Sequence, residues 1–199
     1  PGEPGVYYHM GIGFASGRTP ARVTPILQSM RARAERRNRA MLERLNSHLA
    51  PVAIDYERDV LPLTPAGNAT ERHMLQALIA AVGRELPDEN GRNAYWAERL
   101  GVTTGEVAGT SDNYARLSNL VRSKLMKKGG VGYVTPTPES FPTVAEFHEF
   151  IVACGALPCA AWLDGTTEGE QAIGELLELL IGQGVVALNI IPDRNWNLP

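Results

Sequence analysis

Between residues 20 and 128, apolar residues recur at spacings of three, four or seven, which is the period of amphipathic α-helices. In the first part of this stretch, Leu27, Met30 and Ala34 fall on one helical face. The predicted helices cover residues 20–49, a segment from Asn68 or Thr70 to Leu86, residues 92–100 and 103–107, and a segment capped by Ser111 that ends at Gly129. The pattern therefore predicts an almost wholly helical block.

The rest of the chain alternates between extended and helical patterns. A mixed aromatic and aliphatic run over residues 6–14 ends at glycines, which is typical of a short strand. After residue 129 the pattern predicts a helix over 143–154, a strand over 157–163, a helix over 168–181 and a strand over 185–191. Both later strands are continuous apolar runs, as expected in a parallel sheet that is covered by helices.

This order of elements predicts an α/β fold, namely a (β/α) barrel segment that is interrupted by a helical insertion. We expect three parts, which are a first barrel strand and loop over residues 1–19, a helical insertion over 20–128 and barrel βα units over 129–199. The three strands should lie in one sheet, with the last two parallel.

Composition changes this picture little. The 199 residues are 44% hydrophobic and 21% charged, with a formal net charge of −3, which excludes a disordered or collagen-like chain. No apolar run approaches the roughly 18 to 20 residues of a membrane-spanning helix, and we expect no signal peptide. The two cysteines, Cys154 and Cys159, lie in apolar surroundings and favour a reducing compartment. We expect a cytoplasmic protein with no membrane partner.

Both ends of the sequence have loop character. The chain opens with Pro1 and a Gly-Glu-Pro-Gly run, and residues 193–199 follow directly after an apolar strand. We therefore expect the sequence to be a fragment of a longer protein.

Polar residues that could carry chemistry gather where the predicted strands end. Asp164 follows one strand, Asp193 and Asn195 follow the last, and His9 lies in the first. Functional residues of parallel barrels lie at the carboxyl ends of the strands. An Asp at such a place is explained as well by a structural turn, so both interpretations of Asp164 and Asp193 stay open.

Several segments follow one another in the order of a known family. The chain contains, in turn, YYHMGIGF, RARAERRNRAMLERLN, IDYERDVL, TERHMLQALI, KGGVGYVTPTPESFPTVAEFHEFIVACGALPCAAWLD and LLELLIGQGVVALNIIPDRN. These correspond to a His-bearing strand that ends in Gly, an Arg- and Asn-rich helix, a short extended piece, a helix opening with Arg and His, and two returning helix–strand pairs. Over nearly the whole chain, this order resembles the phosphoesterase branch of the polymerase-and-histidinol-phosphatase (PHP) family.

The resemblance implies a PHP-like (β/α) barrel with an inserted helical subdomain, and hydrolysis of a phosphate ester by a cluster of divalent metal ions held by His, Asp and Glu. Such ions lower the pKa of bound water and stabilise charge on phosphoryl oxygens. Imidazole and carboxylate ligands suit zinc, manganese or iron, and the sequence does not choose among them. The expected substrate is a phosphorylated small molecule or a nucleotide.

The departures from the family pattern concern the metal ligands. His9 matches a ligand position, although a structural role in the core is equally open for it. The family's early His-x-His motif is absent, and Trp162 and Leu163 stand where the family has a ligand His followed by Pro. Because a catalytic metal usually takes about three protein ligands, we expect the fragment to be inactive and to bind no metal by itself. Asp164 and Asp193 are the candidate catalytic residues.

Arg72 and His73 open a predicted helix, where the helix dipole and a bidentate guanidinium favour a substrate phosphate. A solvent-exposed Arg–His pair is the simpler interpretation, and it stays open. With Asn195 they are the expected substrate-binding residues, and we expect them to converge with His9 on one rim. The remaining histidines, His48 and His148, are expected to have surface or packing roles.

An arginine-rich stretch supports a rival function. Six arginines crowd one predicted helix, at positions 31, 33, 36, 37, 39 and 44. Such clusters contact phosphates in nucleic acids, but the net charge is negative and no aromatic residues interleave, so nucleic acid is not the expected partner. The rival is a non-catalytic PHP-like module that uses its helical insertion to bind a protein or nucleic acid.

Overall fold

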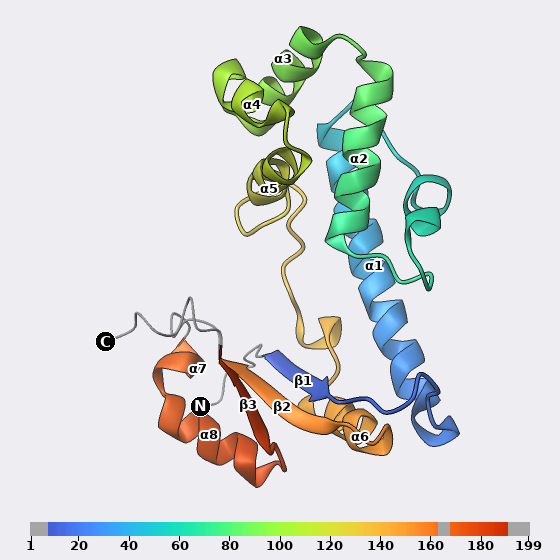
Figure 1. Ribbon diagram of the computed structural model, residues 1–199, viewed down its shortest axis with the longest axis vertical. Coiled ribbons are helices and arrows are strands. Elements are labelled where there is room, and N and C mark those ends of the chain that lie inside the picture. The colour runs from blue at the N-terminus through green and yellow to red at the C-terminus, as the bar shows by residue number, and fades with distance from the viewer. Residues whose placement is uncertain (1–7, 163–167, 191–199) are drawn as a thin grey trace. The chain divides into compact units, whose positions relative to one another are not determined.

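The computed structural model describes residues 8–162 and 168–190, and it divides into two compact units (Figure 1). The first unit contains the described residues up to Met30 and those from Phe141 onward, and the second contains Arg31–Ser140. The second unit is therefore continuous in sequence, whereas the first is assembled from two segments that the second separates.

The first unit is built on a small open sheet with the strand order β1-β2-β3. Its strands are β1 (Tyr8–Ile12), β2 (Leu157–Trp162) and β3 (Ala187–Ile190). Strand β1 is antiparallel to β2, and β2 is parallel to β3. The prediction of one sheet with its last two strands parallel is confirmed.

The predicted (β/α) barrel is wrong. The structure is mostly helical, and its sheet has three strands among the described residues and does not close. A barrel requires every strand to pair on both sides, whereas β1 and β3 pair only with β2 in the described part of the chain. The apolar runs at 157–163 and 185–191 correctly predict two parallel strands, but such a local pattern does not count the strands of a sheet.

Helices α6 (Val144–Ala153), α7 (Glu168–Gln171) and α8 (Ile173–Gly182) accompany this sheet, with a short 3₁₀ turn at Ala21–Val23. Leu180 of α8 and the adjacent Val185 pack with Ala160 of β2 in a small buried cluster. Leu180 is the α8 residue that is buried against the sheet, whereas Leu179 and Ile181 are exposed.

The second unit contains most of α1 (Thr24–His48), then α2 (Glu71–Glu85), α3 (Glu89–Leu100), α4 (Thr104–Ser111) and α5 (Tyr114–Leu125). A π-helical turn at Tyr56–Val60 and 3₁₀ turns at Leu61–Leu63 and Pro138–Ser140 complete it. Its core is formed by buried side chains that include Met41, Leu45, Leu49, Val52, Tyr56, Val60, Met74, Leu75, Leu78, Val82, Trp96, Val107, Val121, Leu125 and Met126. None of the helices among the described residues combines the length and the apolar character that crossing a bilayer requires.

Side-chain caps set several helix starts. The carboxylate of Asp88 accepts a hydrogen bond from the Gly91 amide at 2.6 Å, so α3 begins at Glu89, three residues before the predicted start. The side chain of Asn113 caps α5, whereas Ser111, which was predicted to cap this helix, is the last residue of α4. Local capping chemistry, and not the apolar period, fixes these boundaries.

Candidate functional site

The strand register brings His9 close to the end of the sheet at which β2 and β3 stop, where the sequence predicts functional residues. Because β2 and β3 are parallel, their last residues, Trp162 and Ile190, are paired at one edge. Because β1 is antiparallel to β2, its first residue, Tyr8, pairs with Ala161 at that same edge. His9 follows and pairs with Ala160. His9 therefore lies level with a residue two positions before the carboxyl ends of the parallel pair.

The imidazole of His9 packs against helix α6. Its centroid lies 5.7 Å from that of Phe147, edge to face, and 5.8 Å from that of His148, with the two imidazole planes 9° from parallel. Burial is the main cause that lowers the pKa of His9, and the nearby His148 lowers it further, while the backbone of Cys159 acts in the opposite direction. His9 is therefore a neutral imidazole at neutral pH, which is the form that binds a metal ion or accepts a proton.

His148 is a site residue that the sequence analysis assigned only to a surface or packing role. Its Nδ1 atom is buried and has no hydrogen-bond partner in the described part of the chain. Its position on α6 gives the signal that could have found it. His148 lies four residues after Val144 and three before Ile151, so it shares the apolar helix face with them.

Gly184, in the turn between α8 and β3, makes room for this imidazole. It has a φ of +88°, and a Cβ there would lie 3.1 Å from both Cε1 and Nε2 of His148. Glycine is thus favoured at position 184 both by the backbone conformation and by the neighbouring ring.

Three of the predicted site residues, Asp164, Asp193 and Asn195, lie outside the described residues. Trp162, which stands where the family has a ligand His, ends β2, and its Nε1–H donates to the Glu170 carbonyl at 3.4 Å. The indole therefore contributes a structural hydrogen bond between β2 and α7.

The two predicted phosphate-binding residues of the helical unit have different surroundings. The Nδ1 atom of His73 accepts a hydrogen bond from the Thr70 amide at 3.0 Å, so this imidazole caps the start of α2. Arg72 is exposed, and none of the described residues forms a hydrogen bond or an ion pair with its side chain. The guanidinium of Arg72 is therefore exposed to solvent, whereas the imidazole of His73 stabilises the start of α2.

The described residues do not make up a complete metal site. No group of three or more His, Cys, Asp or Glu side chains that could hold a metal ion occurs among them. His9 supplies one suitable nitrogen, and the nearby thiol of Cys159 is a poor ligand because burial raises its pKa. Any complete site therefore needs donors from beyond residues 8–162 and 168–190.

At least two of the six arginines on α1 are held by interactions within the helical unit. Arg39 pairs with Glu35 at 2.7 Å and also with Glu57, and its guanidinium lies 4.4 Å from the centroid of the Tyr56 ring. Arg44 donates to the Tyr133 carbonyl. These contacts stabilise the packing of α1 and occupy donors that a nucleic-acid phosphate would require.

Comparison of the chain with protein-family models, with curated proteins and with solved structures gives no match. The likeness to the PHP family therefore stays an inference from the quoted segments.

Proposed function

We propose that this chain is the central part of a metal-dependent phosphoesterase similar to the PHP family. The observation that carries the proposal is the position of His9 near the carboxyl ends of β2 and β3, level with Ala160 and two residues before those ends. Functional residues of parallel sheets lie at this edge, because the loops that follow the strands can vary without disturbing the core.

Two carboxylates support this assignment by their place in the sequence. Asp164 comes two residues after the end of β2 at Trp162, and Asp193 comes three residues after the end of β3 at Ile190. In the proposal they act beside His9, with Asn195 as a contact to the substrate. The neutral state of His9 supports its role as a ligand for a zinc, manganese or iron ion.

The substrate that we propose is a phosphorylated small molecule or a nucleotide. Arg72 supports this class, because an exposed guanidinium in the first turn of α2 combines a bidentate donor with a favourable helix dipole. His73 contributes by capping the helix that carries Arg72. We place this activity in the cytoplasm, in keeping with the free thiols of Cys154 and Cys159.

The test measures metal content and hydrolysis of p-nitrophenyl phosphate on the full-length protein and on the 199-residue chain. We expect the full-length protein to bind about two or three metal ions and to lose its turnover on chelation, and the shorter chain to be inactive, because a catalytic metal takes about three ligands. In the full-length protein, His9→Gln should lower metal content and turnover, whereas His148→Gln, which alters the same packing, should retain the metal.

A full-length protein without bound metal and without turnover contradicts the proposal. That result would instead support the rival function, a non-catalytic module that binds a partner through its helical unit.

A further inference from the structure

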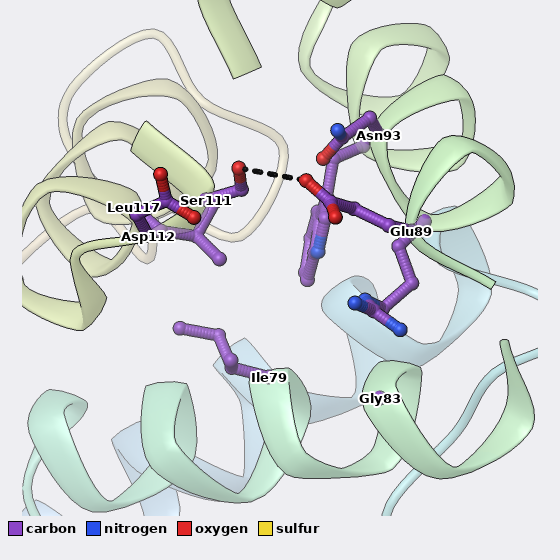
Figure 2. A pocket seen from close by; sticks show the side chains of 9 residues that line it. Ile79, Gly83, Glu89, Asn93, Ser111, Asp112 and Leu117 are labelled. Carbon is purple, nitrogen blue, oxygen red and sulfur yellow. Dashed lines mark hydrogen bonds between the residues drawn. The ribbon is translucent and has the colours of Figure 1, made fainter. Parts of the chain in front are cut away.

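A pocket of about 250 Å³ lies within the helical unit, between α2, α3 and the turn that joins α4 to α5 (Figure 2). One part of its lining is apolar and includes Ile79 and Trp96. The other is polar and includes Glu89, Asn93, Ser111 and Asp112. This division distinguishes the pocket from the apolar core beside it.

Asn93 is the polar side chain deepest in this lining. Its exposed fraction is 6%, and its amide forms no hydrogen bond with any of the described residues. The amide points into the pocket, toward the carboxylate of Glu89 (Figure 2). The amide faces the pocket and not the apolar core, so a group bound in the pocket can supply its hydrogen-bond partners.

Two carboxylates flank the mouth of the pocket. Neither Glu89 nor Asp112 forms an ion pair with a described residue. The hydroxyl of Ser111 is 3.5 Å from Glu89 but 2.9 Å from the carbonyl of Ala108. Because a hydroxyl has one proton, the shorter bond takes it and leaves the Glu89 oxygens available as acceptors.

Arg92 is the cationic side chain of this lining, and it bonds to backbone carbonyls beside the pocket. Arg92 donates to the carbonyls of Leu86, at 3.1 Å, and of Pro87. The lining contains two carboxylates, Glu89 and Asp112, and one guanidinium, Arg92, so its net charge is −1.

We propose that this pocket binds the cationic head of an alkylguanidinium or alkylammonium group. The carboxylates of Glu89 and Asp112 and the amide oxygen of Asn93 accept its N–H donors, and Ile79 and Trp96 contact its alkyl chain. The cation arrives either as a free small molecule or on an arginine or lysine side chain.

A bare divalent ion fits this lining less well. Such an ion takes six or more oxygen ligands, and no cluster of three or more His, Cys, Asp or Glu side chains is found among the described residues. The apolar wall formed with Ile79 and Trp96 would also have no contact to make with a hydrated metal ion. An alkyl cation uses both parts of the lining.

The test is calorimetric titration of the 199-residue chain at low salt with n-butylguanidinium, with n-butanol as the neutral analogue. We expect the cation to bind at least about tenfold more tightly than the alcohol, since hydrogen bonds to charged groups are the stronger ones. Glu89→Gln and Asn93→Ala should each weaken the cation about tenfold, with unchanged helix content by circular dichroism. The matched control is Glu98→Gln, also on α3, whose side chain is 72% exposed and does not line the pocket.

Titration with a blocked arginine, N-acetyl-arginine methylamide, distinguishes a free small molecule from the side chain of a partner protein. Binding as tight as that of n-butylguanidinium supports a partner's side chain, and exclusion of the blocked compound supports a free small molecule. Three results would overturn the proposal, namely equal binding of n-butanol, unchanged binding by Glu89→Gln, and displacement of n-butylguanidinium by Mg²⁺ at about equal concentration, which would indicate a metal site.

Discussion

The imidazole rings of His9 on β1 and His148 on α6 stack 5.8 Å apart, with their planes 9° from parallel. His148 disfavours a charge on His9, because two imidazolium ions at this distance would repel. Burial and this neighbour together lower the pKa of His9. The pair therefore fixes a neutral ring at the sheet edge where the proposed chemistry takes place.

Replacing Gly184 by Ala should disturb this pair. The new Cβ would lie 3.1 Å from the His148 ring, on a backbone with φ of +88°. We therefore expect the first unit, which contains the sheet, to lose about 1–2 kcal/mol of unfolding free energy. Urea unfolding measures the loss. Gly182→Ala is the control, because that glycine ends α8 and a Cβ there meets nothing within 4 Å, so its stability should stay equal or rise. Equal stability of the two variants would contradict the packing described for His148.

Replacing His73 by Ala should destabilise the helical unit by about 1 kcal/mol, because the Thr70 amide loses its acceptor at the start of α2. His73→Gln should retain most of the stability, since glutamine closes the same capping box. Thermal unfolding checks both variants.

Arg72→Ala, the neighbouring exposed position, should leave stability unchanged and, in the full-length protein, should weaken substrate binding. Unchanged kinetics of Arg72→Ala would remove that residue from the proposed site.

Glu71 should make the helical unit sensitive to acid. Burial alone would raise the pKa of its carboxyl, but hydrogen bonds from Lys127 and Arg122 outweigh burial and hold the pKa below its ordinary value of 4.5. A lowered pKa stabilises the fold above pH 4.5, and this contribution is lost as the pH falls through the lowered value. At pH 7, Glu71→Gln should cost about 1 kcal/mol.

Urea unfolding over a pH series checks this expectation. The difference between Glu71→Gln and the unaltered chain should shrink toward zero in acid. Glu98→Gln, whose carboxylate is exposed and lies 3.5 Å from Arg99, should differ little from the unaltered chain at any pH. A Glu71→Gln difference that does not change with pH would mean that the carboxylate's charge is not the stabilising feature.

Replacing Asn38 by Ala should cost the helical unit about 2 kcal/mol. Asn38 is 4% exposed, and its Nδ2–H donates at 2.8 Å to the carbonyl of the equally buried Ala69, which would be left without this donor. Chemical unfolding measures the effect. The control is Asn119→Ala, an exposed position on α5, where alanine's helix propensity should leave stability equal or slightly higher. Near-equal stabilities of the two variants would refute the role of the buried bond.

The local patterns of the sequence predict the secondary structure more successfully than the fold. The apolar runs at 157–163 and 185–191 correctly indicate two parallel strands, although Leu157, Leu188 and Ile190 are exposed and the expected cover on both faces is incomplete. The same pattern carries no information on the number of strands or on closure, and this is why the barrel prediction is wrong. The antiparallel pairing of β1 depends on contacts with residues far along the chain, which periodicity does not reveal.

In the candidate site, too, the sequence indicates single residues but not which of them meet in space. His9 is identified because its neighbours in sequence resemble a known motif, and the strand register then adds the edge at which it lies. His148 was not identified as a site residue, since its place on the apolar face of α6 is equally consistent with simple packing, and its neighbour His9 lies far away in the sequence. The pocket residues, from Glu89 to Asp112, are common surface types whose shared cavity arises only when α2, α3 and α4 pack together.

The pairing of β1 with β2 has a consequence for the order of events during synthesis. Ile12 pairs with Leu157, which the ribosome adds about 145 residues later. At roughly 5–20 residues per second, β1 waits about 7 to 30 s for its partner. Arg31–Ser140, being continuous, can fold during that interval. A chain that ends shortly before Leu157 and has left the ribosome should therefore contain a protease-resistant helical unit and a β1 segment that chaperones and proteases can still reach.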